Sequence, residues 1–303
     1  MSSSGGSSKV IVIAFLANVG IALAKFVGAF FSGSTSLLAE AVHSSVDCSN
    51  QILLLIGNKK AKKPPDQKHP LGYGREAFFW SFLVAILLFS LGGIFAIYEG
   101  VHKFGDQDEV SSPLLGLIIL LVSLMLEAYS FSACLKEVKA QNRFGSLWKW
   151  FQNTKSSELL VIFTEDAAAL AGLSIASICL GLAWLTGHGY WDAIGSVLVG
   201  IILVIVAVLL GFEVKSFIIG EAPTDDIRDF VVGEAKKLFP SGSVLNFIAI
   251  QTGSDEVMLS SKIHPGNLKD LDIAIDLVNQ LERSTKAKFK EVRWQFVELD
   301  KED

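Results

Sequence analysis

Long apolar stretches, separated by short polar segments, dominate the first 215 residues of the chain. They cover about residues 9–31, 34–57, 77–103, 113–135, 157–185 and 190–215. A hydrocarbon layer of roughly 30 Å needs about 20 mostly apolar helical residues, so each stretch is long enough to cross a membrane once. The pattern predicts six transmembrane helices in one domain, residues 9–215, after a Ser- and Gly-rich, disordered start, residues 1–8.

The pattern changes after residue 216 to charged, amphipathic sequence. Helical periodicity is found in residues 225–239 and 270–286, and strand character in residues 244–251, 257–263 and 290–299. This helix-strand-strand-helix-strand order predicts a small α+β, ferredoxin-like domain over residues 216–303. One layer of helices on three strands leaves a sheet edge and a face that can pair with a second copy.

Composition supports membrane residence, because 51% of the residues are hydrophobic, 19% are charged and the mean hydropathy is +0.47. Basic residues gather in the connections 58–76 and 136–156, and the other connections between the stretches have none. The positive-inside rule then places both termini and the C-terminal domain in the cytoplasm. We expect a multi-pass protein of a bacterial inner membrane.

Several ionisable residues fall where lipid should surround the chain, among them Lys25 and Glu127. A charge at the centre of a membrane helix costs about 2.5–3.5 kcal/mol, so such residues usually mark a pathway or a satisfied partner. His43 and Asp47 lie four residues apart near the middle of their stretch, on one helix face. Imidazole nitrogen and carboxylate oxygen suit Zn²⁺, Fe²⁺, Co²⁺ or Mn²⁺. The alternative is that the pair only holds two helices together.

A second acidic pair, Glu165 and Asp166, lies in the fifth stretch at about the depth of Asp47. The small residues that follow allow close helix approach, so we expect Asp166 to meet the first pair across a helix interface. The alternative is that Lys25 bonds one of these two acids. Glu40 and Asp192 lie nearer the helix ends, and we expect interfacial exposure for both.

Three motifs carry a family resemblance: SLLAEAVHSSVD at 36–47, DQKHPLGYGRE at 66–76 and WDAIGSVLVG at 191–200 resemble the cation diffusion facilitator family. HSSVDCSNQ at 43–51 and EDAAALAGL at 165–173 are similar to the branch that includes the mitochondrial zinc transporter of animals. The resemblance implies a homodimeric metal/proton antiporter that exports zinc or a related ion from the cytosol. It implies neither an enzyme nor a nucleic-acid-binding protein.

The resemblance also implies site residues. The family's ligand pair in the second span falls on His43 and Asp47, and its pair in the fifth span falls on Ile162 and Asp166. Ile162 cannot bind a metal. Glu165, one turn further along, is one substitute ligand, and three protein ligands plus water are the other arrangement.

In the first cytoplasmic loop, Asp66 and His69 match positions that bind a second ion in some members, but Tyr73 stands at a further His position. The alternative there is a turn fixed by the neighbouring prolines.

We therefore expect export of a divalent transition-metal ion, Zn²⁺ first, by exchange with protons. Loss of a His donor makes the site richer in oxygen, which keeps Fe²⁺, Mn²⁺ and Co²⁺ open. The rival hypotheses are a membrane metal sensor or scaffold without transport, and a channel. Metal binding without flux would favour the sensor, and flux insensitive to a pH gradient would favour the channel.

Overall fold

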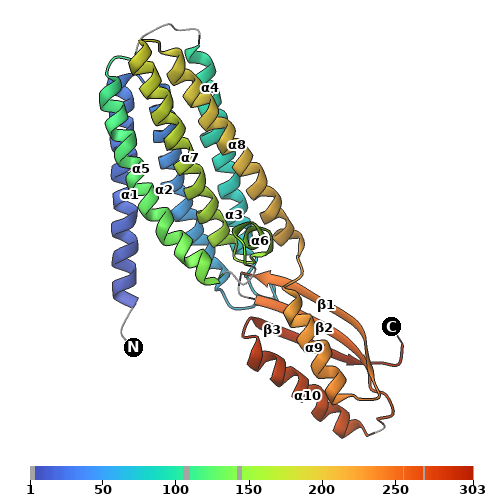
Figure 1. Cartoon of the computed structure of the whole chain (residues 1–303). Coiled ribbons are helices and arrows are strands. Elements are labelled where there is room, and N and C mark those ends of the chain that lie inside the picture. Colours follow the sequence, from blue (N-terminus) through green and yellow to red (C-terminus); the bar gives the residue numbers. More distant parts are fainter. Residues whose placement is uncertain (1–3, 105–109, 142–144, 255, 269, 303) are drawn as a thin grey trace. The chain divides into compact units, whose positions relative to one another are not determined.

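The computed structural model describes residues 4–104, 110–141, 145–254, 256–268 and 270–302. Contacts divide the chain into two compact units (Figure 1). The helical unit comprises Met1–Ile56, Trp80–Phe151 and Glu158–Val214, and the second unit comprises Gly57–Phe79, Gln152–Ser157 and Lys215–Asp303. Of the predicted disordered start, residues 1–3 lie outside the described part, and the first helix begins at Ser4.

Helices cover every one of the long apolar stretches. They are α1 (Ser4–Ser32), α2 (Thr35–Ala61), α3 (Glu76–Leu87) with η1 (Leu88–Ile94) and α4 (Phe95–Lys103), α5 (Pro113–Gln141), α7 (Ser157–Thr186) and α8 (Tyr190–Ile219), with the short α6 (Leu147–Asn153) before α7. In the part of the chain that the structure describes, four helices are long and apolar enough to cross a membrane: Glu76–Lys103, α5, α7 and α8. In α1, the stretch Asn18–Ser32 is apolar but shorter.

A buried carboxylate of α8 holds the start of α2. Gly33 turns the chain between α1 and α2 with a φ of 66°, which glycine adopts without steric cost. Asp192 then accepts hydrogen bonds from the Ser34 hydroxyl at 2.7 Å and from the backbone N–H of Thr35 at 2.5 Å. Its charge also suits the positive end of the α2 dipole. The expectation that Asp192 is exposed is wrong, because its exposure is 0%.

The helix over Glu76–Lys103 departs from the regular helix that its apolar pattern predicts. Between α3 and α4 its turns widen into the π-helix η1, and Gly92 and Gly93 of that segment are buried. Within η1, the Ser90 hydroxyl donates to the carbonyl of Ile86, at the end of α3, at 2.8 Å. A π turn shifts the register of side chains along the helix, which hydrophobic periodicity does not reveal.

Glycines bring this helix against α8. A Cβ on Gly200 would lie 2.7 Å from the Gly93 carbonyl oxygen and 2.8 Å from the Ile97 nitrogen. The Ser196 hydroxyl donates to the Ala96 carbonyl at 2.8 Å in the same interface. The two backbones therefore pack in direct contact, as small residues allow in membrane helix pairs.

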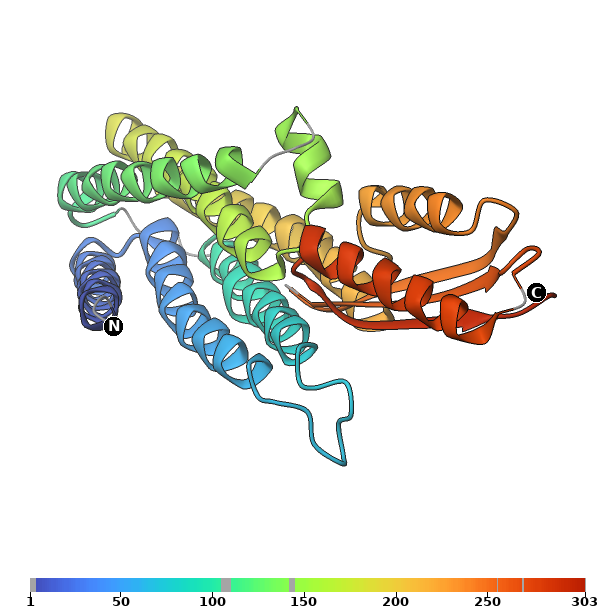
Figure 2. The ribbon, with the colours of Figure 1, turned by 90° about the horizontal axis from the view of Figure 1, so that it is seen from below.

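The second unit contains a three-stranded sheet with two helices. The strands β1 (Ser243–Gly253), β2 (Glu256–His264) and β3 (Val292–Leu299) lie in that order, with β1 antiparallel to β2 and β2 parallel to β3. Helices α9 (Asp225–Leu238) and α10 (Leu271–Lys288) lie beside these strands (Figure 2). Val231 of α9 and Leu281 of α10 share a core with Leu259 of β2. The predicted helix-strand-strand-helix-strand order is confirmed.

The loop after α2 belongs to this second unit because it packs on the turn between β1 and β2. A Cβ on Gly74 would lie 2.6 Å from the Thr252 carbonyl oxygen and 3.0 Å from the Gly253 Cα. Only a residue without a side chain allows such an approach between two backbones.

The glycine contact with α8 gives a test of the helical packing. Gly200→Ala places a methyl group against the backbone of the helix over Glu76–Lys103, and overpacking of this kind costs about 1–3 kcal/mol. We expect a lower melting temperature for the purified protein, measured by tryptophan fluorescence on heating. Gly211→Ala is the matched control on α8, since nothing lies within 4 Å of its added Cβ. Equal melting temperatures for the two variants would contradict this packing.

Candidate functional site

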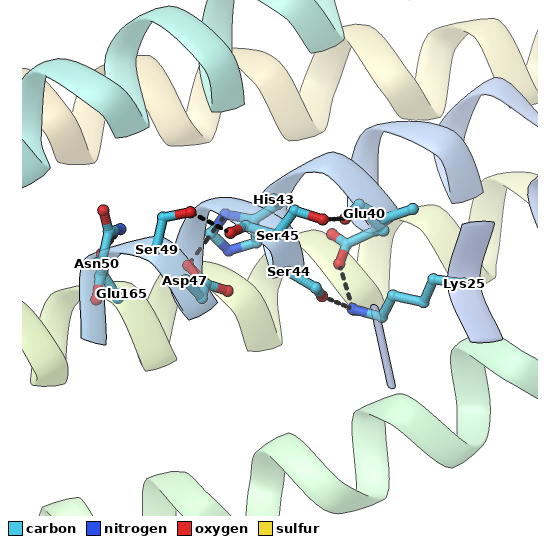
Figure 3. A network of polar contacts seen from close by, with 10 residues as sticks. Lys25, Glu40, His43, Ser44, Ser45, Asp47, Ser49, Asn50 and Glu165 are labelled. Carbon is cyan, nitrogen blue, oxygen red and sulfur yellow. Dashed lines mark hydrogen bonds and ion pairs between the residues drawn. The ribbon is translucent and has the colours of Figure 1, made fainter. Parts of the chain in front are cut away.

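His43 and Asp47 lie together on α2, as their spacing predicts (Figure 3). The Nδ1 atom of His43 is 3.6 Å from Oδ1 of Asp47, and the His43 side chain is only 1% exposed. Among the described residues, neither ring nitrogen of His43 nor this Asp47 oxygen has a hydrogen-bond partner. Buried polar atoms nearly always have partners, so this pair has spare capacity to bind a cation or a proton.

A cavity of about 340 Å³ lies among α1, α2, α5 and α7, and Asp47 lines it. Carboxylates from three of these helices face this one space: Asp47 of α2, Glu127 of α5, and Glu158, Glu165 and Asp166 of α7. Ile162 lines it as well. The position at which the resemblance expects a ligand therefore does face the same cavity as the acids.

The two acids of α7 differ in their surroundings. The Asn50 amide of α2 donates a hydrogen bond to Oε1 of Glu165, which is 7% exposed. Oδ2 of Asp166 is buried and has no hydrogen-bond partner within the described residues. Glu165 therefore links α7 to α2, whereas Asp166 keeps an oxygen for another ligand. The assignment of either acid as a metal ligand stays a prediction.

A buried ion pair lies beside these groups. The Lys25 ammonium of α1 donates to the Ser44 hydroxyl at 2.7 Å and to Oε2 of Glu40 at 3.2 Å (Figure 3). Lys25 is 1% exposed and Glu40 is 0% exposed. In low dielectric an ammonium needs a carboxylate, and packing of α1 against α2 supplies Glu40.

One alternative for these residues is therefore not found, and one expectation is wrong. Lys25 does not bond Glu165 or Asp166, and Glu40 is not exposed at the interface. Gly172 of α7 makes room for this carboxylate, since a Cβ there would lie 2.5 Å from Oε1 of Glu40.

The donor types fit a borderline divalent cation, with one imidazole and several carboxylates. Across the described ranges, however, no group of three His, Cys, Asp or Glu side chains is close enough together to hold a metal ion. The candidate ligands thus share a cavity without converging on one point. Joint coordination requires the helices or side chains around the cavity to move closer together.

Asp66 and His69 lie in the first loop, which belongs to the second unit. Oδ1 of Asp66 accepts the backbone N–H groups of Lys68 at 2.9 Å and of His69 at 2.8 Å, and Oδ2 accepts the Tyr73 hydroxyl at 2.7 Å. The bond from Tyr73 lowers the pKa of Asp66, which keeps this carboxylate ionised at neutral pH. These bonds fix a turn. A metal role for Asp66 and His69 stays a prediction.

The sequence singled out Glu127 as an ionisable residue inside a span but assigned it no role. Depth was the available signal, because Glu127 lies near the midpoint of α5 (Pro113–Gln141), just as Asp47 lies near the midpoint of α2. No local pattern in the sequence indicated the hydrogen bond between Asn50 and Glu165, because 115 residues separate the two.

Comparisons with known proteins match this architecture. The family model for the cation efflux transmembrane domain matches residues 11–218, which confirms the resemblance read from the motifs. Over 219 residues the chain is 30% identical to the mitochondrial proton-coupled zinc antiporter SLC30A9 of Mus musculus. Over 225 residues it is 32% identical to metal tolerance protein C4 of Arabidopsis thaliana. An uncharacterized transporter of Methanocaldococcus jannaschii is 25% identical over 280 residues.

The shared length differs among these relatives. The alignment covers 72% of this chain but 39% of the mouse antiporter, and 72% of this chain but 48% of the plant protein. With the archaeal transporter it covers 90% of this chain and 93% of the relative. The chain thus spans less than half the length of the animal and plant relatives.

The buried ion pair gives a prediction about stability. Lys25→Met leaves the Glu40 carboxylate buried without its cation, and loss of one partner of such a pair costs about 3–5 kcal/mol. We expect a marked loss of stability in a denaturant titration of the purified protein. The double variant Lys25→Met with Glu40→Gln removes both charges and should recover most of that loss. A single variant as stable as the double variant would show that the pair is not needed.

Proposed function

The chain belongs to the cation efflux family of membrane transporters, and from this premise we propose that it exports a divalent transition-metal ion from the cytosol in exchange for protons. Zn²⁺ is the first candidate for the transported ion. The animal relatives are named proton-coupled zinc antiporters, and another relative, from Yersinia pestis, is named a zinc transporter.

One observation carries the proposal within the chain itself. His43 is buried with both ring nitrogens unpartnered among the described residues, and it lies against Asp47, which lines a cavity shared with Asp166. In this proposal these three residues bind the ion. A pair that served only to join helices would bond each other or a neighbouring helix, whereas here their distance of 3.6 Å exceeds a normal hydrogen bond.

The exchange with protons follows from the chemistry of the donors. A metal ion requires a neutral imidazole and ionised carboxylates, so protons and metal compete for the same atoms. When the site faces the cytosol it takes up the ion. When it faces the other side, protons displace the ion and are carried back. An oxygen-rich donor set also admits Fe²⁺, Mn²⁺ and Co²⁺.

The proposal includes the membrane topology. We place α1 and α2 in the bilayer with the four apolar helices, which gives six spans in a transport domain of residues 9–215. Support comes from burial, because the ionisable residues Lys25, Glu40 and His43 of α1 and α2 lie inside the helical unit. Residues 216–303 then form a cytoplasmic, ferredoxin-like domain, both termini are cytoplasmic, and the membrane is a bacterial inner membrane. The proposal also includes a homodimer, because the edge strand of a three-stranded sheet can pair with a second copy.

Transport by purified protein in liposomes tests the function. We expect Zn²⁺ to enter the liposomes and protons to move in the opposite direction, both read with fluorescent indicators. His43→Ala and Asp47→Ala should each reduce zinc flux at least about tenfold, since even groups that only support metal ligands often contribute this much to affinity. Ser49→Ala is a matched control on α2, because that side chain is exposed and, among the described residues, bonds only the Ser45 carbonyl.

The outcomes separate the rival functions. Undiminished flux in either the His43 or the Asp47 variant would refute the assignment of the site. Zinc binding without any flux would favour a membrane sensor or scaffold. Flux that ignores a pH gradient but rises steeply with membrane potential would favour a channel.

A further inference from the structure

Glu127 of α5 lines the same cavity as Asp47 of α2 and Asp166 of α7. Throughout the described residues, Glu127 has no hydrogen bond or ion pair. Three carboxylates that line one cavity, with no lysine or arginine of the described residues bonded to them, need a cation or protons from outside.

The packing of α5 explains why Glu127 points into this space. Phe131, one turn further along α5, packs on Phe163 of α7 with ring centroids 5.6 Å apart. Residues four apart lie on one helix face, so the contact that docks α5 on α7 also turns Glu127 toward it. Ser130 of α5 lines the cavity beside Glu127.

The proposed transport site lacks a fourth protein ligand, because Ile162 lines the cavity where a donor is expected. Glu165 is the nearer acid in sequence, but one of its oxygens is already taken by the amide of Asn50. His43 supplies the independent sign that a ligand belongs here: it is 1% exposed, unpartnered among the described residues, and aimed at Asp47 on the cavity wall.

We infer that Glu127 is the fourth protein ligand of the transported ion and supplies from α5 the donor that Ile162 does not supply from α7. The inference rests on the proposed function. It makes the site one imidazole and three carboxylates, contributed by three helices. Such a set is harder than one with two imidazoles, so Glu127 also determines specificity and widens it toward Mn²⁺ and Fe²⁺.

The test measures Zn²⁺ affinity of the full chain in lipid nanodiscs by competition with a fluorescent zinc chelator. Glu127→Gln keeps the size of the side chain but removes its charge, and we expect the affinity to fall at least about tenfold. Glu137→Gln is the matched control, because it removes a carboxylate from the same helix outside the cavity lining. It should leave the affinity unchanged.

A double variant makes the test independent of folding defects. Ile162→Asp combined with Glu127→Gln moves the carboxylate from α5 to α7 on the wall of the same cavity, and we expect it to recover Zn²⁺ affinity. The preference for Zn²⁺ over Mn²⁺, measured by competition of the two metals, should change in the single variant and not in Glu137→Gln.

The results separate this inference from the proposed function. If Glu127→Gln binds Zn²⁺ like the unaltered protein while Asp47→Asn loses it, Glu127 is not a ligand and the transport site stands without it. If the double variant binds no better than Glu127→Gln, the compensation between α5 and α7 is refuted. If the unaltered protein neither binds nor transports Zn²⁺, the proposed function itself fails.

Discussion

A carboxylate buried between helices needs a partner, and this constraint organises the helical unit. Asp192 of α8 accepts the hydroxyls and amides at the start of α2. Glu40 of α2 pairs with a lysine of α1, and Glu165 of α7 accepts an amide of α2. Each of these bonds joins two helices through buried side chains. The buried polar contacts thus hold α2 in place from both its start and its centre.

The carboxylates that lack such a bond to a neighbouring helix line the cavity. Asp47, Asp166 and Glu127 face it from three helices, beside the buried His43, which has no hydrogen-bond partner among the described residues. Among the residues that the structure describes, no lysine or arginine bonds these three carboxylates, so ions that enter the cavity have to balance their charge. Metal ions and protons both meet this requirement, and the two exclude each other at the same oxygen atoms. In this account the cost of burying charge is the physical basis of exchange.

Much of the fold follows from local pattern. Apolar length located the long helices of the helical unit, and amphipathic periods located every helix and strand of the C-terminal region. The four-residue spacing of His43 and Asp47 predicted their contact, because helix geometry alone determines it. Local pattern could not predict contacts between residues that lie far apart in the sequence. Asp192 was expected to be exposed, yet it meets residues more than 150 positions earlier in the chain. Likewise, the π turn at Gly93 leaves no trace in hydropathy.

The central claim is that the ion is held by one imidazole and by carboxylate oxygens at the cavity. X-ray absorption spectroscopy of Zn²⁺ bound to the purified protein reads this donor set directly. The account predicts a first shell of nitrogen and oxygen atoms at roughly 2.0–2.2 Å with the multiple scattering of a single imidazole. A sulfur shell at about 2.3 Å, or no imidazole signal, would contradict it.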